Sequence, residues 1–391
     1  MRPMLLHGSG RLFDGHVAHS PWALLVESDG RIAWLGTDPA SAPREAEAND
    51  LADALVTPGL VDAHTHPVFA GDRADEAAAR LEGTPYGGGI LRTVAATRAA
   101  SDEQLEALVE GRLRRALAAG TTTVEAKSGY GLSLDEELRA LRILGRVAER
   151  LPMRVVRTFL GAHAVPPEAA SVNAYCADVC EVMIPAVAAE GLATFVDAFC
   201  DRGFFTVGHV EQIAAAAAAH GLGLRLHAEQ FARTGATEAG IRLGAASVDH
   251  LEQLDAAGVA ALAASSTVAT LLPAPAIVLR DALPPARALL DAGATVALAS
   301  DANAGTFSGW GAMPLVIGLG ATLLGMSAAE ALSAATAGGA AALGQGGDIG
   351  RLAPGARADL VAWDTDHEGA FALRLGDVRA LRTWVGGIEV D

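Results

Sequence analysis

Eight short apolar runs alternate with longer helical segments through the middle of this 391-residue chain. Runs without polar alternation are typical of strands buried on both faces, as in a parallel sheet covered by helices. Eight strands alternating with helices predict an α/β fold, a (β/α)8 barrel of the TIM type. A doubly wound open sheet is the alternative, but no Gly-x-Gly-x-x-Gly motif follows the first run. The runs span residues 55–66, 121–128, 154–163, 195–200, 223–227, 246–250, 268–272 and 295–301.

Several of the helical segments between these runs open with a capping-box pattern. In this pattern a serine at the helix start is followed three residues later by a glutamine or glutamate. The pairs are Ser101 with Gln104, Ser133 with Glu136, and Ser327 with Glu330.

The two chain ends have a different character from the barrel region. Residues 23–27 and 31–35 flank the turn dipeptide Asp29-Gly30, which predicts a β-hairpin. The last forty residues are also turn-rich and β-like, so we expect both ends to share one small β-sandwich. The predicted parts are residues 1–56 and 348–391 for the sandwich and 57–347 for the barrel.

The composition excludes several classes of partner. With 51% hydrophobic and 19% charged residues, the chain can bury a large core. A net charge of −17 and a pI near 5.0 argue against nucleic acid or an anionic membrane as partners. An anionic substrate would meet a repulsive field, so its site needs positive groups of its own.

The cysteines and the apolar segments indicate the compartment. Cys176, Cys180 and Cys200 leave one thiol unpaired in any disulfide scheme, which favours reduced cysteines and a cytoplasmic protein. The longest apolar run, residues 312–326, is too short to cross a bilayer. We therefore expect a soluble protein with no membrane partner.

Histidines gather where the predicted strands end, which is where barrel enzymes carry their chemistry. His64 and His66 lie two residues apart, so on a strand both imidazoles share one face. Imidazoles with a carboxylate suit Zn²⁺ or Fe²⁺ better than Mg²⁺ or Ca²⁺. We expect one divalent ion with an open position for water, and Asp301 to take a proton from that water. The predicted ligands are His64, His66, His227 and Asp301.

With histidines after predicted strands one, five and six and an aspartate after strand eight, the chain resembles the amidohydrolase superfamily. Within it, the chain is similar to the imidazolonepropionase family nearly end to end. The most family-specific stretches are Lys127-Ser-Gly-Tyr-Gly-Leu132 and Gly161-Ala-His-Ala-Val-Pro166. The resemblance implies hydrolytic opening of 4-imidazolone-5-propanoate to N-formimino-L-glutamate in histidine degradation. It also implies a homodimer and a small anionic heterocycle as substrate.

The resemblance implies roles for individual residues. Arg73 can bind a propionate carboxylate with two hydrogen bonds, and the negative net charge makes such a group necessary. His250 would bond the attacked carbonyl or the water, with a second-metal ligand as its alternative role, and His250 or His163 would stabilise the oxyanion. The expected catalytic residues are Asp301, His250 and Gln230. The expected substrate-binding residues are Arg73, Tyr130, His163, Gln230, Asn303, Gly305 and Thr306.

Lys127 bears on the number of metal ions. Two-metal members of the superfamily usually carry a bridging lysine after strand four, whereas the one lysine here follows strand two. One metal ion is therefore expected. Lys127 itself is either a substrate contact or one half of a buried ion pair with Glu125 or a neighbouring strand.

Two positions depart from the family pattern. Some relatives carry glutamate where this chain has Gln230, and glutamine can exchange hydrogen bonds but cannot shuttle a proton. Ala304 stands where the family commonly has proline, which would leave that loop freer. Both changes bear on substrate selectivity.

Two other functions fit parts of the pattern. A deaminase of guanine or cytosine would share the metal ligands but would give Arg73 no carboxylate to bind. A barrel serving only as a scaffold would be expected to have lost part of the ligand set, which is complete here.

Overall fold

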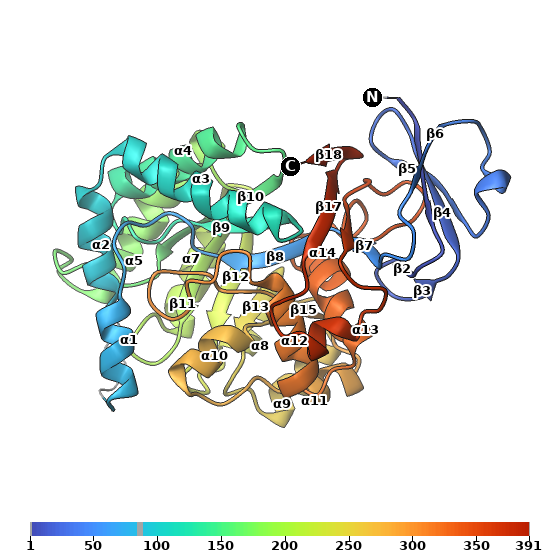
Figure 1. Ribbon diagram of the computed structural model, residues 1–391. Coiled ribbons are helices and arrows are strands. Elements are labelled where there is room, and N and C mark those ends of the chain that lie inside the picture. The colour runs from blue at the N-terminus through green and yellow to red at the C-terminus, as the bar shows by residue number, and fades with distance from the viewer. Residues whose placement is uncertain (1, 84–88, 391) are drawn as a thin grey trace.

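The core of the molecule is an eight-stranded parallel barrel, which confirms the predicted fold class (Figure 1). The structure is a computed structural model that describes residues 2–83 and 89–390. The strands follow one another around the barrel in chain order. They are β8 (Leu60–Thr65), β9 (Thr121–Lys127), β10 (Arg154–Ala162), β11 (Phe195–Cys200), β12 (Gly223–Ala228), β13 (Ser247–His250), β14 (Val268–Leu271) and β15 (Val296–Leu298).

Backbone hydrogen bonds between the first and last strands close the barrel at one end. The His66 N–H donates to the Ala302 carbonyl at 2.9 Å, and the Asp301 N–H donates to the His64 carbonyl at 3.0 Å. Three of these four residues were predicted to bind metal or lie beside it. Closure of the barrel therefore brings together side chains more than 230 residues apart in sequence.

Helices surround the barrel (Figure 1). Those before β12 are α1 (Ala74–Leu81), α2 (Ile90–Ala99), α3 (Asp102–Ala118), α4 (Leu134–Ala148), α5 (Val172–Asp178), the π-helical turn η2 (Val179–Met183), α6 (Ile184–Ala189) and α7 (Val207–Ala219). Those after it are α8 (Ala236–Arg242), α9 (Ala256–Ala263), α10 (Pro273–Leu279), α11 (Ala286–Asp291), α12 (Met313–Leu323), α13 (Ala328–Ser333), the π-helical turn η3 (Ala334–Gly338), α14 (Gly339–Ala342) and α15 (Ala370–Leu373).

Two of the three predicted capping boxes are present. Ser101 and Ser327 each cap a helix reciprocally with the residue three positions on. Ser133 precedes α4 as predicted but makes no side-chain cap hydrogen bond, so that capping box is wrong. Its expected partner, Glu136, binds Arg139 instead, at 2.9 Å.

The apolar run at residues 55–66 forms two strands in two different sheets. β7 (Val56–Pro58) pairs with β16 (Leu360–Trp363), whereas β8 pairs with β9 in the barrel. The change of partner falls at Gly59, where a Cβ atom would lie 2.1 Å from Thr122 Oγ1. Glycine permits this close approach of the chain to β9.

Strands from both chain ends form a small β-sandwich beside the barrel, as predicted (Figure 1). The predicted hairpin is the antiparallel pair β4 and β5. Apolar residues of both sheets, including Leu24, Leu360 and Trp384, share one buried core. One sheet holds β5 (Ile32–Gly36), β4 (Trp22–Val26), β1 (Met4–Gly8) and β6 (Glu47–Asp50). The other holds β18 (Ile388–Val390), β17 (Ala380–Val385), β16, β7, β2 (Leu12–Phe13) and β3 (Ala18–His19). The short 3-10 turn η1 (Pro39–Ser41) connects β5 to β6.

One helical stretch, Val172–Ala189, is long and apolar enough to span a membrane by length and composition alone. Its buried side chains Cys176, Ile184 and Val187 belong to the same core as the barrel, so it is part of the helical layer. All three cysteines are free thiols. The cytoplasmic location, the homodimer and the domain boundaries stay predictions.

Candidate metal centre and active site

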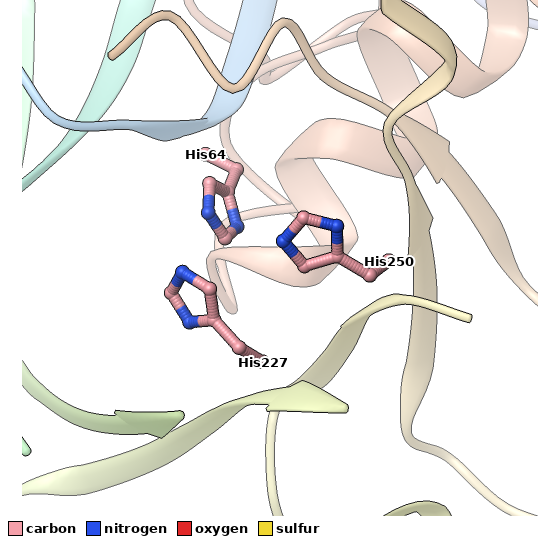
Figure 2. Close-up of side chains that lie close together, drawn as sticks. All are labelled: His64, His227 and His250. Atoms are coloured by element: carbon pink, nitrogen blue, oxygen red, sulfur yellow. The ribbon is translucent and has the colours of Figure 1, made fainter. Parts of the chain in front are cut away.

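The side chains of His64, His66 and Asp301 face one another at the carboxyl ends of the barrel strands, next to the backbone bonds that close the barrel. His64 Nε2 lies 3.2 Å from His66 Nε2. The Asp301 Oδ1 atom is 3.3 Å from His66 Nε2 and 3.7 Å from His64 Nε2. Figure 2 shows the rings of His64, His227 and His250 turned toward a common space. All of these side chains are buried.

The hydrogen bonds of two histidines determine which ring nitrogen faces this space. His64 Nδ1 donates to Asp249 at 2.7 Å, and His227 Nδ1 donates to Asp197 at 3.1 Å. Each ring therefore presents an Nε2 lone pair. Among the described residues, the buried His227 Nε2 has no hydrogen-bond partner. Imidazole nitrogens that face one another beside a carboxylate, one of them without a hydrogen-bond partner, fit a divalent cation.

His250 also lies at the rim but in a different electrostatic setting. Its ring centroid is 5.7 Å from that of His64 and 5.4 Å from that of His227. Burial lowers the pKa of His250, but Glu252, whose carboxylate lies 3.5 Å from Nδ1, outweighs burial together with Asp301 and Asp249 and raises it. His250 is thus paired with an acid of its own.

Five buried charged side chains support these histidines, and sequence reasoning missed the role of three of them, Asp197, Arg225 and Asp249. Lys127 forms ion pairs with Glu125 and Asp197, both at 2.8 Å, so of its two expected roles it has that of the buried ion pair. The available signal was charge at alternating positions inside otherwise apolar strands, which points these side chains into the barrel. The five are Glu125, Lys127, Asp197, Arg225 and Asp249.

Six of the seven predicted substrate residues line one pocket together with His66, His227, His250 and Asp301. Ile90, Phe199 and Phe231 complete its wall. Gly305 instead lines a neighbouring hollow of about 660 Å³, which shares Arg73 and Thr306 with the pocket. The six are Arg73, Tyr130, His163, Gln230, Asn303 and Thr306.

Arg73 lines both the pocket and this hollow, and it lies between Glu76 and Gly305. It is 4% exposed, and its Nε and Nη2 atoms donate to Glu76 at 3.0 and 2.6 Å. A Cβ atom at position 305 would lie 2.1 Å from Arg73 Nη1, so Gly305 makes room for the guanidinium. Gly305 therefore acts by its lack of a side chain.

His163 is fixed by one hydrogen bond to the loop after β9. Its Nδ1 lies 2.9 Å from the Gly129 carbonyl, which can only accept, so Nδ1 carries the proton. Burial is the main reason that the pKa of His163 lies well below its usual value, and the nearby His66 and His227 lower it further. The neutral ring then offers only an Nε2 lone pair to the pocket.

Comparison with known proteins accounts for nearly the whole chain. Residues 55–390 match the amidohydrolase family. The imidazolonepropionase of Ectopseudomonas mendocina is 48% identical over 384 residues, covering 94% of each chain. That of Nocardia farcinica is 47% identical over 367 residues, covering 93% of this chain and 91% of the relative. The chain belongs to the amidohydrolase family, among the imidazolonepropionases.

Solved structures of other amidohydrolases share the fold at low identity. A 5-methylcytosine deaminase from Klebsiella pneumoniae superimposes with a TM-score of 0.80 at 18% identity, covering 99% of this chain and 98% of that one. A zinc-bound adenosine deaminase from Xanthomonas campestris gives a TM-score of 0.76 at 20% identity, covering 99% and 92%. These likenesses support the fold.

In this amidohydrolase, Gln230 and not Glu229 faces the pocket. The Glu229 carboxylate pairs with Arg233 at 2.7 Å and accepts from the Gly235 N–H at 2.9 Å, so it shapes the loop after β12. Glu229, His250 and Asp301 have φ angles of 59°, 83° and 48°, which are unusual for residues other than glycine. Such backbone strain at strand ends is common where side chains are held for function.

The loop after β15 is held by Asn303. Its amide nitrogen donates to the Asp301 carbonyl and Thr306 Oγ1, and its amide oxygen accepts from the Gly305 and Thr306 N–H groups, all within 2.6 to 2.9 Å. These four bonds use the donors and the lone pairs of the amide. Asn303 thus fixes the loop that Ala304 had been expected to leave freer.

Proposed function

We propose that this chain hydrolyses one ring C–N bond of 4-imidazolone-5-propanoate, giving N-formimino-L-glutamate in histidine degradation. The supporting observation is Arg73, a buried cation in the same pocket as the metal-binding cluster. A ring with a propionate tail fits this combination, because the carboxylate would meet Arg73 while the ring carbonyl reaches His66, His227 and Asp301. An uncharged heterocycle would give Arg73, which is paired with Glu76, no substrate carboxylate to bind.

One divalent cation, Zn²⁺ or Fe²⁺, would be held by His64, His66, His227 and Asp301, because imidazole and carboxylate ligands suit both metals. Bound there, such an ion lowers the pKa of a water molecule and polarises a carbonyl group. The support for one ion is that Lys127 is already enclosed by Glu125 and Asp197.

Asp301 moves the proton in this proposal. Water adds to the ring carbonyl carbon while Asp301 accepts its proton, and Asp301 then returns that proton to the ring nitrogen as the C–N bond breaks. One C–O bond forms, one C–N bond breaks, and no net proton is consumed at the enzyme. Burial raises the pKa of Asp301, but the hydrogen bond and charge of His66, with His250 and His227, outweigh burial and lower it.

His250 and His163 receive opposite roles. His250 stands beside Glu252 and donates a hydrogen bond to the carbonyl oxygen as negative charge develops there. His163 has its proton on Nδ1, so its Nε2 accepts a hydrogen bond from a ring N–H group. Gln230 can donate or accept and would orient the ring without moving a proton.

Turnover of enzymatically generated imidazolone propionate, followed by the loss of its ultraviolet absorbance, tests the proposal. Purified protein with about one equivalent of zinc or iron should consume the substrate. Asp301→Asn should lower kcat by at least about a hundredfold, the range of general acid–base catalysis. Metal analysis of that variant separates lost metal from lost proton transfer. Guanine and cytosine serve as controls, and turnover of either without turnover of imidazolone propionate would overturn the assignment.

A further inference from the structure

The ligand histidines are backed by side chains for which the proposed reaction has no direct use. Glu125, Lys127, Asp197, Arg225 and Asp249 are each 0% exposed. Burying five charged groups is costly unless each is paired and hydrogen-bonded. Their contacts form two short chains that end on metal-binding histidines.

The first chain runs from Lys127 to His227. Lys127 Nζ lies 2.8 Å from Asp197 Oδ2, and the Asp197 carboxylate lies 3.1 Å from His227 Nδ1. The backbone N–H of His227 also donates to Asp197, at 3.2 Å. The Asp197 carboxylate accepts from Lys127 and from the backbone of His227, and its contact with Nδ1 keeps the proton of His227 on that atom.

The second chain runs from Arg225 to His64 and is built in the same order. Arg225 Nη2 lies 3.1 Å from Asp249 Oδ2, which accepts from His64 Nδ1 at 2.7 Å. Arg225 also donates to the carbonyls of Ala63 and Ala342, both at 2.7 Å, so its position is fixed by the backbone. Ser247 Oγ donates to the other Asp249 oxygen.

Glu125 joins the two chains. Its carboxylate lies 2.8 Å from Lys127 Nζ and 3.7 Å from Arg225 Nε. Together with Asp301, the centre contains four carboxylates and two side-chain cations, an excess of two negative charges. One divalent cation neutralises that excess.

We propose that Lys127 and Arg225 are positioning residues of the metal centre. Each holds one carboxylate, Asp197 or Asp249, which in turn fixes the proton and the ring orientation of one histidine ligand. This inference rests on the proposed metal centre but not on the proposed substrate. Partners that orient metal ligands through such hydrogen bonds typically change metal affinity about 10- to 100-fold.

The test measures metal affinity and ligand geometry in the full chain. Lys127→Met keeps the length and removes the charge. Competition with a chelator should show a Zn²⁺ Kd raised about 10- to 100-fold. The visible absorption of the Co²⁺-loaded variant should also differ from that of Co²⁺-loaded wild type, because His227 is no longer held. Arg225→Met should show the same two effects through His64.

A purely structural role would lower the melting temperature but leave both metal readouts unchanged, which would overturn the proposal. Arg11→Gln is the control, because Arg11 makes a two-bond ion pair with Glu368 outside the metal centre, at 2.9 and 2.7 Å. It should reduce stability only.

A second variant and a second measurement cover the case in which Lys127→Met does not fold. The double variant Lys127→Met with Asp197→Asn removes both buried charges and leaves an amide oxygen for His227. It should fold with a raised Zn²⁺ Kd, and a wild-type Kd would count against the proposal. In addition, Lys127 is the only lysine in the sequence. The single side-chain signal of ¹⁵N-lysine-labelled protein should therefore shift when Zn²⁺ is added to metal-free wild type, and no shift would contradict the coupling.

Discussion

Arg73 is the residue on which the proposed choice of substrate depends, and it is already paired with a carboxylate of the protein. Its Nε and Nη2 atoms are bonded to Glu76, whose carboxylate is of the same kind as the proposed substrate group. A substrate carboxylate that binds the same edge of the guanidinium must displace Glu76. Glu76 is thus a competitor whose removal should strengthen substrate binding.

We predict opposite changes in KM for the two partners. Arg73→Gln should raise KM for imidazolone propionate at least about tenfold with a smaller effect on kcat, because a charge-assisted bond is worth about 1.5–3 kcal/mol. Glu76→Gln should lower KM by about two- to fivefold, which corresponds to about 0.4–1 kcal/mol and is close to the net contribution of a single hydrogen bond. Steady-state kinetics on both variants checks this.

The neighbouring carboxylate provides a control for Glu76. Asp75 precedes it in α1 and pairs with the exposed Arg92 at 2.6 Å, away from Arg73. Asp75→Asn should leave KM unchanged. A higher KM in Glu76→Gln would mean that Glu76 supports Arg73 and does not compete with the substrate.

Residues at the strand ends could be predicted from sequence, whereas most contacts of the buried charged residues, the Lys127–Glu125 pair excepted, could not. His64, His66 and Asp301 follow apolar runs, and the barrel rule alone places such ends on one rim. The contacts of Asp197 and Asp249 depend on which strands become neighbours and on how their side chains extend across the barrel. The sequence of a single strand shows neither which strands become its neighbours nor how far its side chains reach across the barrel.

At the scale of elements, the loop after β9 is held by one carboxylate. Glu137, in the first turns of α4, accepts hydrogen bonds from the N–H groups of Gly129, Gly131 and Leu132 at 3.0, 2.9 and 2.8 Å. Tyr130 lies within this loop and lines the pocket, and the Gly129 carbonyl holds His163. Burial raises the pKa of Glu137, and these three bonds oppose that rise.

We predict that Glu137→Gln loosens the loop that carries Tyr130 and Gly129. The amide keeps one acceptor but brings a donor against backbone N–H groups, so the free energy of unfolding should fall by about 1–3 kcal/mol. In the folded enzyme KM should rise and the rate of proteolysis at the loop should increase. Denaturant unfolding and limited proteolysis measure the two effects.

Glu136→Gln is the matched control, because Glu136 is adjacent in sequence and its carboxylate pairs with Arg139 near the surface. It should change the free energy of unfolding by less than about 0.5 kcal/mol and leave KM unchanged. Equal effects in the two variants would show that the position in α4, and not the loop contact, is responsible.

Element boundaries show where sequence patterns stop being informative. The apolar run at residues 55–66 predicts a strand correctly, but it cannot show that β7 and β8 belong to different sheets. That outcome depends on β16, some 300 residues later, which offers the pairing edge for β7. Likewise, the pattern at Ser133 predicts the start of α4 but not the competing bond of Glu136 to Arg139.

At the scale of the whole molecule, two electrostatic effects act on an anionic substrate. The net charge of −17 repels it at long range. The hollow next to the pocket is lined by Arg73, Arg80, Arg112 and Arg115 with one acid, Asp72, and attracts it at short range. Salt separates the two effects, because the screening length falls from about 30 Å at 0.01 M to about 10 Å at 0.1 M and about 3 Å at 1 M.

We therefore predict that kcat/KM for imidazolone propionate passes through a maximum as salt is raised. Between 0.01 and 0.1 M the distant acids are screened first, so kcat/KM should rise by about twofold, and by 1 M the arginines are screened as well and kcat/KM should fall again. Arg115→Gln should weaken the fall. Arg114→Gln, which breaks a surface pair with Glu110 on the same helix, should not. A steady rise with salt in wild type would mean that the net charge dominates even at the mouth of the pocket.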